Sequence, residues 1–173
     1  MARFLVFPFI ALCVALSFDA HAQKCSLDVD KVDAFSNEHT KSSTVSFGPK
    51  KYKWTMTLSK VNQAYGWELL LTYNGATDAA VKKGDVFKMK LANGKVVDFV
   101  VDEDNKGAAQ VARGMMIMTF RAKGALPEAV VRDIWASPIT LCQINTLGQK
   151  IELEISDSQG EELKEVARCL LLP

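Results

Sequence analysis

The chain has 173 residues, with 21 basic and 20 acidic side chains and a formal net charge of +1. Such a balance leaves no electrostatic footprint for nucleic acid or for an anionic membrane surface. The length suits one domain with a hydrophobic core, and no repeat, low-complexity tract or linker rich in proline and glycine interrupts residues 25–173. We therefore expect one domain over residues 23–173 and no nucleic acid among its partners.

The N-terminal segment has the three parts of a secretory signal peptide. Arg3 supplies a short positive start, residues 4–18 carry no charge, and Ala20-His21-Ala22 has the small-x-small pattern of a cleavage site. A membrane-spanning helix needs roughly 20 apolar residues, which is more than this run contains. The pattern predicts that residues 1–22 are removed, that the protein is exported to the periplasm or the extracellular space, and that no stable membrane anchor remains.

Three cysteines remain after the predicted cleavage: Cys25, Cys142 and Cys169. Disulfides persist in exported proteins, and three pairings are possible, among which the sequence alone cannot choose. We favour Cys25 with Cys169, because this bond would tie both ends of the mature chain to its body. Cys142 would then be free and buried in a strand, as a small apolar side chain.

Alternation of apolar and polar residues predicts half-buried strands along most of the chain. The polar segment 36–43 comes first and is expected to be a mobile loop. Val45 and Phe47 suggest a strand, and residues 51–59 and 66–74 form two clear strands with a hairpin connection between them. Their alternating large side chains are expected to face one core: Tyr52, Trp54, Met56, Leu58, Trp67, Leu69, Leu71 and Tyr73.

A further hairpin is predicted over residues 87–101, and its turn decides its register. Asn93-Gly94 first suggests a two-residue type I′ turn, which would place Asp98 opposite Met89. A three-residue loop with a bulge at the glycine places Val97 opposite Met89 instead. Because a slip of one residue moves every side chain to the other face of the sheet, only the second register keeps the apolar residues together, and we predict it.

The C-terminal third combines strands with two helices. After a strand over residues 111–122, Pro127 opens a short helix over about 127–136, since proline is tolerated in a first helical turn. Residues 139–146 and 150–155 form another hairpin. The result is a mainly β or α+β fold, an antiparallel β-sandwich or curved sheet of seven to eight strands, with a second helix that closes the chain.

This C-terminal helix is predicted over about 159–170. Ser158 and Glu161 have the spacing of a capping box, in which two side chains satisfy backbone N–H groups reciprocally. An apolar stripe follows, which is expected to dock the helix on a sheet: Leu163, Val166, Ala167 and Leu170.

Short segments spread over most of the chain also carry a resemblance. They are Cys25, Val32-Asp33-Ala34-Phe35-Ser36, Val81-Lys82-Lys83-Gly84-Asp85 leading into Leu91-Ala92-Asn93-Gly94, Ser137-Pro138-Ile139, and the closing helix with Cys169. With them the chain resembles small secreted domains of unknown function that are abundant in Bacteroidota-type bacteria. The resemblance implies export, a β-rich fold with a C-terminal helix and no established activity, and it assigns no functional residue.

His39 is the one histidine outside the predicted signal peptide. Nucleophilic hydrolysis would need it as the base, and Ser36, Ser42 and Asp33 lie near it in the sequence. No serine of the chain stands in a G-x-S-x-G elbow, and a polar loop would hold such a triad poorly. We therefore interpret His39 as an exposed loop histidine and assign no catalytic residue.

We assign no residues to a metal or cofactor site either. Zinc and iron sites need clustered cysteine and histidine, which the chain lacks. Residues 102–107 place acids at the first and third positions of a calcium loop, but Lys106 and Arg113 occupy the fifth and twelfth. The run Met115–Met118 could suit Cu(I), yet methionines within a strand normally fill gaps in a core. We expect no bound metal and no cofactor.

The sequence favours a non-enzymatic exported domain that binds a protein or another envelope component through a sheet edge or loops. A small-ligand or glycan binder is an alternative, but Trp54 and Trp67 share a face with core residues, and Trp135 is the aromatic residue expected to be most exposed. A hydrolase whose site assembles only in three dimensions is another alternative. An open strand edge or a contiguous apolar patch would favour protein binding.

Overall fold

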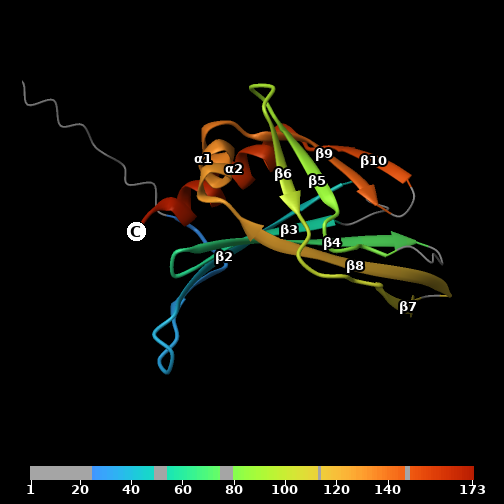
Figure 1. Cartoon of the computed structure of the whole chain (residues 1–173), viewed down its shortest axis with the longest axis horizontal. Helices are drawn as coiled ribbons and strands as arrows, with labels where there is room; N and C mark the ends of the chain where they lie inside the picture. Colours follow the sequence, from blue (N-terminus) through green and yellow to red (C-terminus); the bar gives the residue numbers. More distant parts are fainter. Residues whose placement is uncertain (1–24, 49–53, 75–79, 113, 147–148) are drawn as a thin grey trace, which may run out of the picture.

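The computed structural model describes residues 25–48, 54–74, 80–112, 114–146 and 149–173. Its antiparallel strands form two sheets with two helices beside them (Figure 1). The larger sheet has the order β1 (Val29–Val32), β2 (His39–Phe47), β3 (Trp54–Val61), β4 (Ala64–Asn74), β8 (Met115–Leu126) and β7 (Ala108–Ala112). The smaller sheet has the order β10 (Gln149–Glu154), β9 (Ile139–Thr146), β5 (Val86–Leu91) and β6 (Val96–Val100). One sheet curls into a half-barrel, which confirms the β-rich α+β fold.

The core lies between the inner faces of the two sheets. Trp67 of β4 packs against Phe87 of β5 and Phe99 of β6, with ring centroids 5.6 and 5.3 Å apart. Trp54 is also buried, so these two tryptophans belong to the core as predicted, whereas Tyr52 lies outside the described residues. Trp135 is 43% exposed, as expected from its place near the end of its helix.

The predicted bulged register of the β5–β6 hairpin is confirmed. Met89 stands opposite Val97 and Phe87 opposite Phe99 in the pairing of the two strands. Gly94 adopts a φ of 87°, in the left-handed region that favours glycine. The turn therefore sets a register that directs the large apolar side chains of both strands into the core.

The expectation of a mobile loop over residues 36–43 is wrong. A turn closes just before His39, where β2 begins, so most of this segment is strand. The ammonium group of Lys41 is buried and donates hydrogen bonds to the main-chain oxygens of Leu172 (3.1 Å) and Pro173 (2.9 Å). A buried charge needs such partners, and here they come from the far end of the chain, where a local pattern cannot show them.

The larger sheet also contains two strands that the sequence pattern did not predict, namely β1 and, as a strand distinct from β8, β7. β1 is short and carries charged residues at its centre, so its alternation is weak. The predicted strand over 111–122 is in fact the junction of β7 and β8, which pair with each other. Gly114 lies between them with a φ of 77°, which allows the chain to turn. The described residues thus contain ten strands rather than seven to eight.

Both predicted helices are present, and the second begins earlier than expected. Helix α1 (Glu128–Ala136) follows Pro127, and α2 spans Asp157–Leu171. The capping box of α2 uses Ser156 and Gln159, not Ser158 and Glu161: the Ser156 N–H donates to the Gln159 side-chain oxygen at 3.1 Å. Both pairs have the same spacing, but the backbone bond from Ile155 to Thr140 (3.0 Å) holds the chain in the sheet until Ser156.

Helix α2 connects the two layers. Its predicted apolar stripe is buried, and the helix packs against α1, β2, β3 and β9 (Figure 1). Burial of each large side chain in such a stripe contributes roughly 1.5–3 kcal/mol. Within the residues that the structure describes, no helix is both long and apolar enough to cross a membrane.

Candidate functional site

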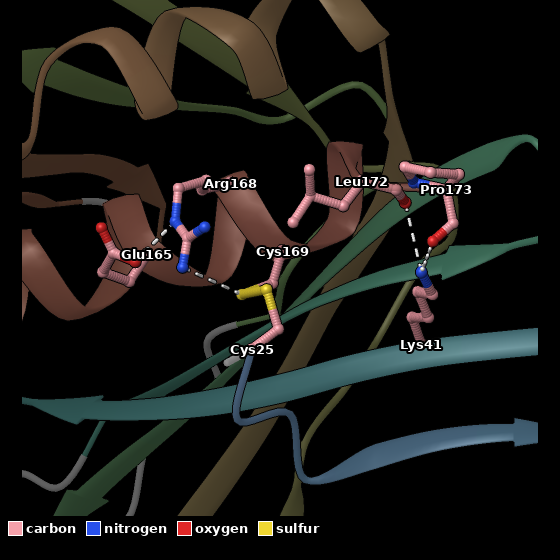
Figure 2. The surroundings of a disulfide bond; sticks show 7 residues. All are labelled: Cys25, Lys41, Glu165, Arg168, Cys169, Leu172 and Pro173. Carbon is pink, nitrogen blue, oxygen red and sulfur yellow. Dashed lines mark hydrogen bonds and ion pairs between the residues drawn. A yellow bond between two sulfur atoms is a disulfide. The ribbon is translucent and has the colours of Figure 1, made fainter. Parts of the chain in front are cut away.

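The cysteines pair as favoured from the sequence. A disulfide joins Cys25 to Cys169 on α2, with Cα atoms 5.5 Å apart, as Figure 2 shows. Cys142 is free and buried in β9. Burial raises the pKa of the Cys142 thiol to about 12, because a thiolate is poorly stabilised in an apolar core. This thiol therefore remains protonated at neutral pH and is a poor nucleophile.

Two links fix the N-terminal strands to the end of α2. The disulfide is one, and the hydrogen bonds from Lys41 to the oxygens of Leu172 and Pro173 are the other (Figure 2). Because β1 pairs with β2, the base of this hairpin is held firmly. The rest of the hairpin projects from the body as the blue loop of Figure 1.

The four residues considered for nucleophilic catalysis do not form a triad: the Ser36 hydroxyl donates to the Asp33 carboxylate at 3.2 Å, but His39 pairs with a different aspartate. The His39 imidazole contacts the carboxylate of Asp30 (Nε2 to Oδ1, 2.6 Å), which is not the aspartate considered from the sequence. His39 is the first residue of β2 rather than a loop residue. Ser42 is an odd number of positions along the same strand, so its side chain points to the opposite face. Asp33 instead accepts hydrogen bonds within the hairpin turn.

That turn presents an aromatic side chain to solvent. The Asp33 carboxylate accepts the backbone N–H groups of Phe35 (2.9 Å) and Ser36 (2.8 Å), and these bonds hold its pKa below the ordinary value. Phe35 is 99% exposed at this tip. An ordered turn thus keeps one large apolar group in water, although a single exposed aromatic residue does not make a patch.

The segment that resembles a calcium loop is occupied by internal hydrogen bonds. It connects β6 to β7, and its Asp104 carboxylate accepts the N–H of Lys83 at 2.7 Å. The side-chain oxygen of Asn105 accepts the N–H of Arg121 at 3.2 Å. In the described ranges, no group of three or more histidine, cysteine, aspartate or glutamate residues is placed to hold a metal ion.

The methionine run is only partly in the core, which corrects the prediction. Met118 is buried, but Met115 and Met116 are exposed. Tyr73, which the alternation placed in the core, is also exposed on β4 beside this end of β8. The larger sheet runs beyond the smaller one here, as the start of β8 beside β7 shows in Figure 1. Successive strand residues point to opposite faces, so Met115 and Met116 do not converge on one ion.

The edge of the larger sheet at β7 differs from the other edges. β7 pairs with β8 alone among the described strands, which leaves one side of its backbone open. Its sequence, AAQVA, has no charged side chain, and Val111 is 75% exposed. The remaining edge strands all carry charges that discourage pairing with another chain: Asp30 and Lys31 in β1, Asp98 in β6, and Lys150, Glu152 and Glu154 in β10.

A polar hollow of about 410 Å³ lies over four strands of the larger sheet. Most of its side chains belong to the face that points away from the smaller sheet, since they alternate with core residues. The lining residues are Thr40, Ser42, Thr57, Ser59, Gly66, Trp67, Glu68, Asp102, Lys123 and Gly124. Trp67 is only 2% exposed, so the hollow has no aromatic platform.

Comparisons with known proteins identify no relative. No family model matches the chain, and neither a curated protein nor a solved structure matches it significantly. The candidate surfaces must therefore be judged on their own geometry. The sequence contained one signal for the β7 edge, the absence of charge over residues 108–112. It contained none for the hollow, which requires the register of four strands.

Proposed function

We propose that the protein is an exported, non-enzymatic binding module that holds an extended segment of a partner protein along β7. The open, uncharged edge of β7 is the observation that carries this proposal. An extended segment that adds to a sheet edge forms main-chain hydrogen bonds with it, and pockets or patches beside the edge select its side chains. Natural sheets usually protect their edges with charge, so an edge without charge is suited to a partner strand.

The side chains around this edge favour an apolar segment. Val111 stands opposite Met116 in the pairing of β7 with β8, so these two exposed side chains share one face. Tyr73 of β4 stands opposite Met118, which lies on that same face. Met115 is exposed on the other face. Alternate residues of an added strand would therefore lie beside Val111 on one side of the sheet and beside Ala108, Gln110 and Ala112 on the other.

A peptide selection tests the proposal. Random peptides displayed on phage are selected against the folded protein, and hydrogen exchange then locates the backbone amides that a selected peptide protects. We expect protection of β7, and loss of binding to Val111→Lys, because the new charge borders the added strand. Val96→Lys is the matched control, since Val96 is half-exposed on the edge strand β6.

Two results would contradict the proposal. One is that the selected peptides protect other strands and leave the amides of β7 unchanged. The other is that they bind Val111→Lys as well as they bind Val96→Lys. Both variants change exposed positions, where a substitution usually alters stability by no more than about 0.5 kcal/mol, so a thermal unfolding curve shows whether each is folded.

A further inference from the structure

The hollow on the outer face of the larger sheet has a simple origin in the strand register. Ser42, Ser59, Gly66 and Ala125 stand opposite one another across β2, β3, β4 and β8, and all four side chains are small. The next row contains larger side chains, among them Glu68 and Lys123. A row of small side chains beside a row of larger ones leaves a depression that runs across the strands. Its volume of about 410 Å³ is within the range of small-molecule sites, roughly 300–1,000 Å³.

Gly66 forms the centre of this depression, and the fold does not require a glycine there. Its φ is outside the left-handed region, and an added Cβ would approach the Ser59 hydroxyl at 3.1 Å and the Gly124 carbonyl oxygen at 3.6 Å. Gly124 differs, because a Cβ there would overlap the Val100 carbonyl. A glycine within a strand lowers stability, and it often marks a place where a ligand or another backbone comes close.

Two hydroxyl groups in the hollow are available to a ligand. Ser42 and Ser59 stand opposite each other, and within the described chain neither hydroxyl forms a hydrogen bond with a protein group. Thr57 is different, since its hydroxyl pairs with that of Thr44 at 2.8 Å. Hydroxyl groups both donate and accept hydrogen bonds, so two of them in the depression can meet either kind of ligand group.

The two charged side chains in the row of larger residues do not pair with each other. Glu68 and Lys123 are directly opposite in the pairing of β4 with β8, where opposite charges usually interact. The structure pairs Glu68 with Arg121 at 3.4 Å and Lys123 with Glu103 at 3.1 Å instead. A carboxylate and an ammonium group therefore border the hollow without closing it.

We propose that this hollow binds a small, neutral, polyhydroxylated molecule of the monosaccharide or disaccharide class. The hydroxyls of such a ligand match those of Ser42 and Ser59, and its ring can lie over Gly66. Glu68 can accept hydrogen bonds from ligand hydroxyls and Lys123 can donate them. An anionic ligand is disfavoured, because Glu68 and Asp102 both line the hollow. With no exposed aromatic ring for stacking, the expected dissociation constant is about 1 mM or higher.

This site is separate from the β7 edge. β7 pairs with the first residues of β8, Met115 to Thr119, whereas the hollow lies near Lys123. Failure at one surface therefore leaves the other proposal intact.

Titration of the isotope-labelled protein with neutral monosaccharides and disaccharides, followed by NMR, tests the inference. We expect shifts confined to amides around Ser59, Gly66 and Lys123. Gly66→Val fills the floor of the hollow and should weaken binding by about tenfold or more, the equivalent of one or two lost hydrogen bonds. Thr72→Val is the matched control, since Thr72 lies on the same strand and the same face as Gly66 but does not line the hollow.

Three outcomes would overturn the inference. The first is that no saccharide of the panel shifts these amides. The second is that Gly66→Val binds as the unaltered protein does while its spectrum and thermal unfolding show that it is folded. The third is that glucose 6-phosphate binds more tightly than glucose, which would place the hollow in the anion-binding class.

Discussion

Replacing Gly124 by alanine tests the close contact between the two sheets. Gly124 faces the core from β8, opposite Trp67 of β4. An added Cβ would overlap the carbonyl of Val100 and lie 2.9 Å from the indole nitrogen of Trp67. The carbonyl cannot easily withdraw, because the N–H of Asp102 donates to the Lys123 oxygen at 3.0 Å and holds this segment against β8.

The magnitude follows from three terms. Overpacking of a core costs about 1–3 kcal/mol, and loss of the hydrogen bond from Asp102 would add about 0.5–1.5 kcal/mol. Alanine in place of glycine returns about 0.5–1 kcal/mol, because it restricts the unfolded chain. The expected decrease in the free energy of unfolding for Gly124→Ala is therefore about 0.5–4 kcal/mol.

Gly66→Ala is the matched comparison, because the two glycines lie on neighbouring strands. Its Cβ would meet the rotatable hydroxyl of Ser59 rather than backbone, so we expect a change between zero and about 1 kcal/mol of stabilisation. Urea unfolding with the disulfide intact measures both variants. The reasoning is refuted if Gly124→Ala unfolds at the same urea concentration as the unaltered protein, or if Gly66→Ala is the less stable of the two.

Replacing Cys25 and Cys169 by serine should lower the free energy of unfolding in urea by about 5 kcal/mol on the chain-entropy model, because their separation is 144 residues; a loss below about 1 kcal/mol would contradict that model. Cys142, with a pKa raised to about 12, should react with iodoacetamide only after denaturation, and its contribution to stability should be present below pH 9.0 and fall as the pH rises toward 12; rapid labelling of the native protein would contradict its burial. The Asp33 pKa is lowered by backbone hydrogen bonds, so the turn should be fully stabilised above pH 3.8 and should loosen below it. The NMR signal of the Phe35 amide, followed as the pH is lowered, measures this change. A signal that does not depend on pH would contradict the prediction.

Local periodicity predicted the elements whose partners are close in the sequence. The β5–β6 register followed from which side chains had to share a face, and the structure places Met89 opposite Val97 as expected. The stripe of α2 is buried as predicted, because helix spacing alone sets which residues share a side. The start of α2 was misplaced by two residues, since the bond from Ile155 to Thr140 selects between two equivalent capping boxes.

The sequence by itself determined the alternating faces of the strands, the hairpin register and the β-rich class, because each depends on neighbours within a few residues. Only the tertiary structure decided which strands lie side by side, as β4 and β8 do although about forty residues separate them. It also decided where the smaller sheet ends, which leaves Met116 in solvent while Met118 is covered. Burial depends on what lies over a face, and the hollow at Gly66 depends on four strands in register. Neither the burial of a side chain nor this hollow can be read from the local order of residues.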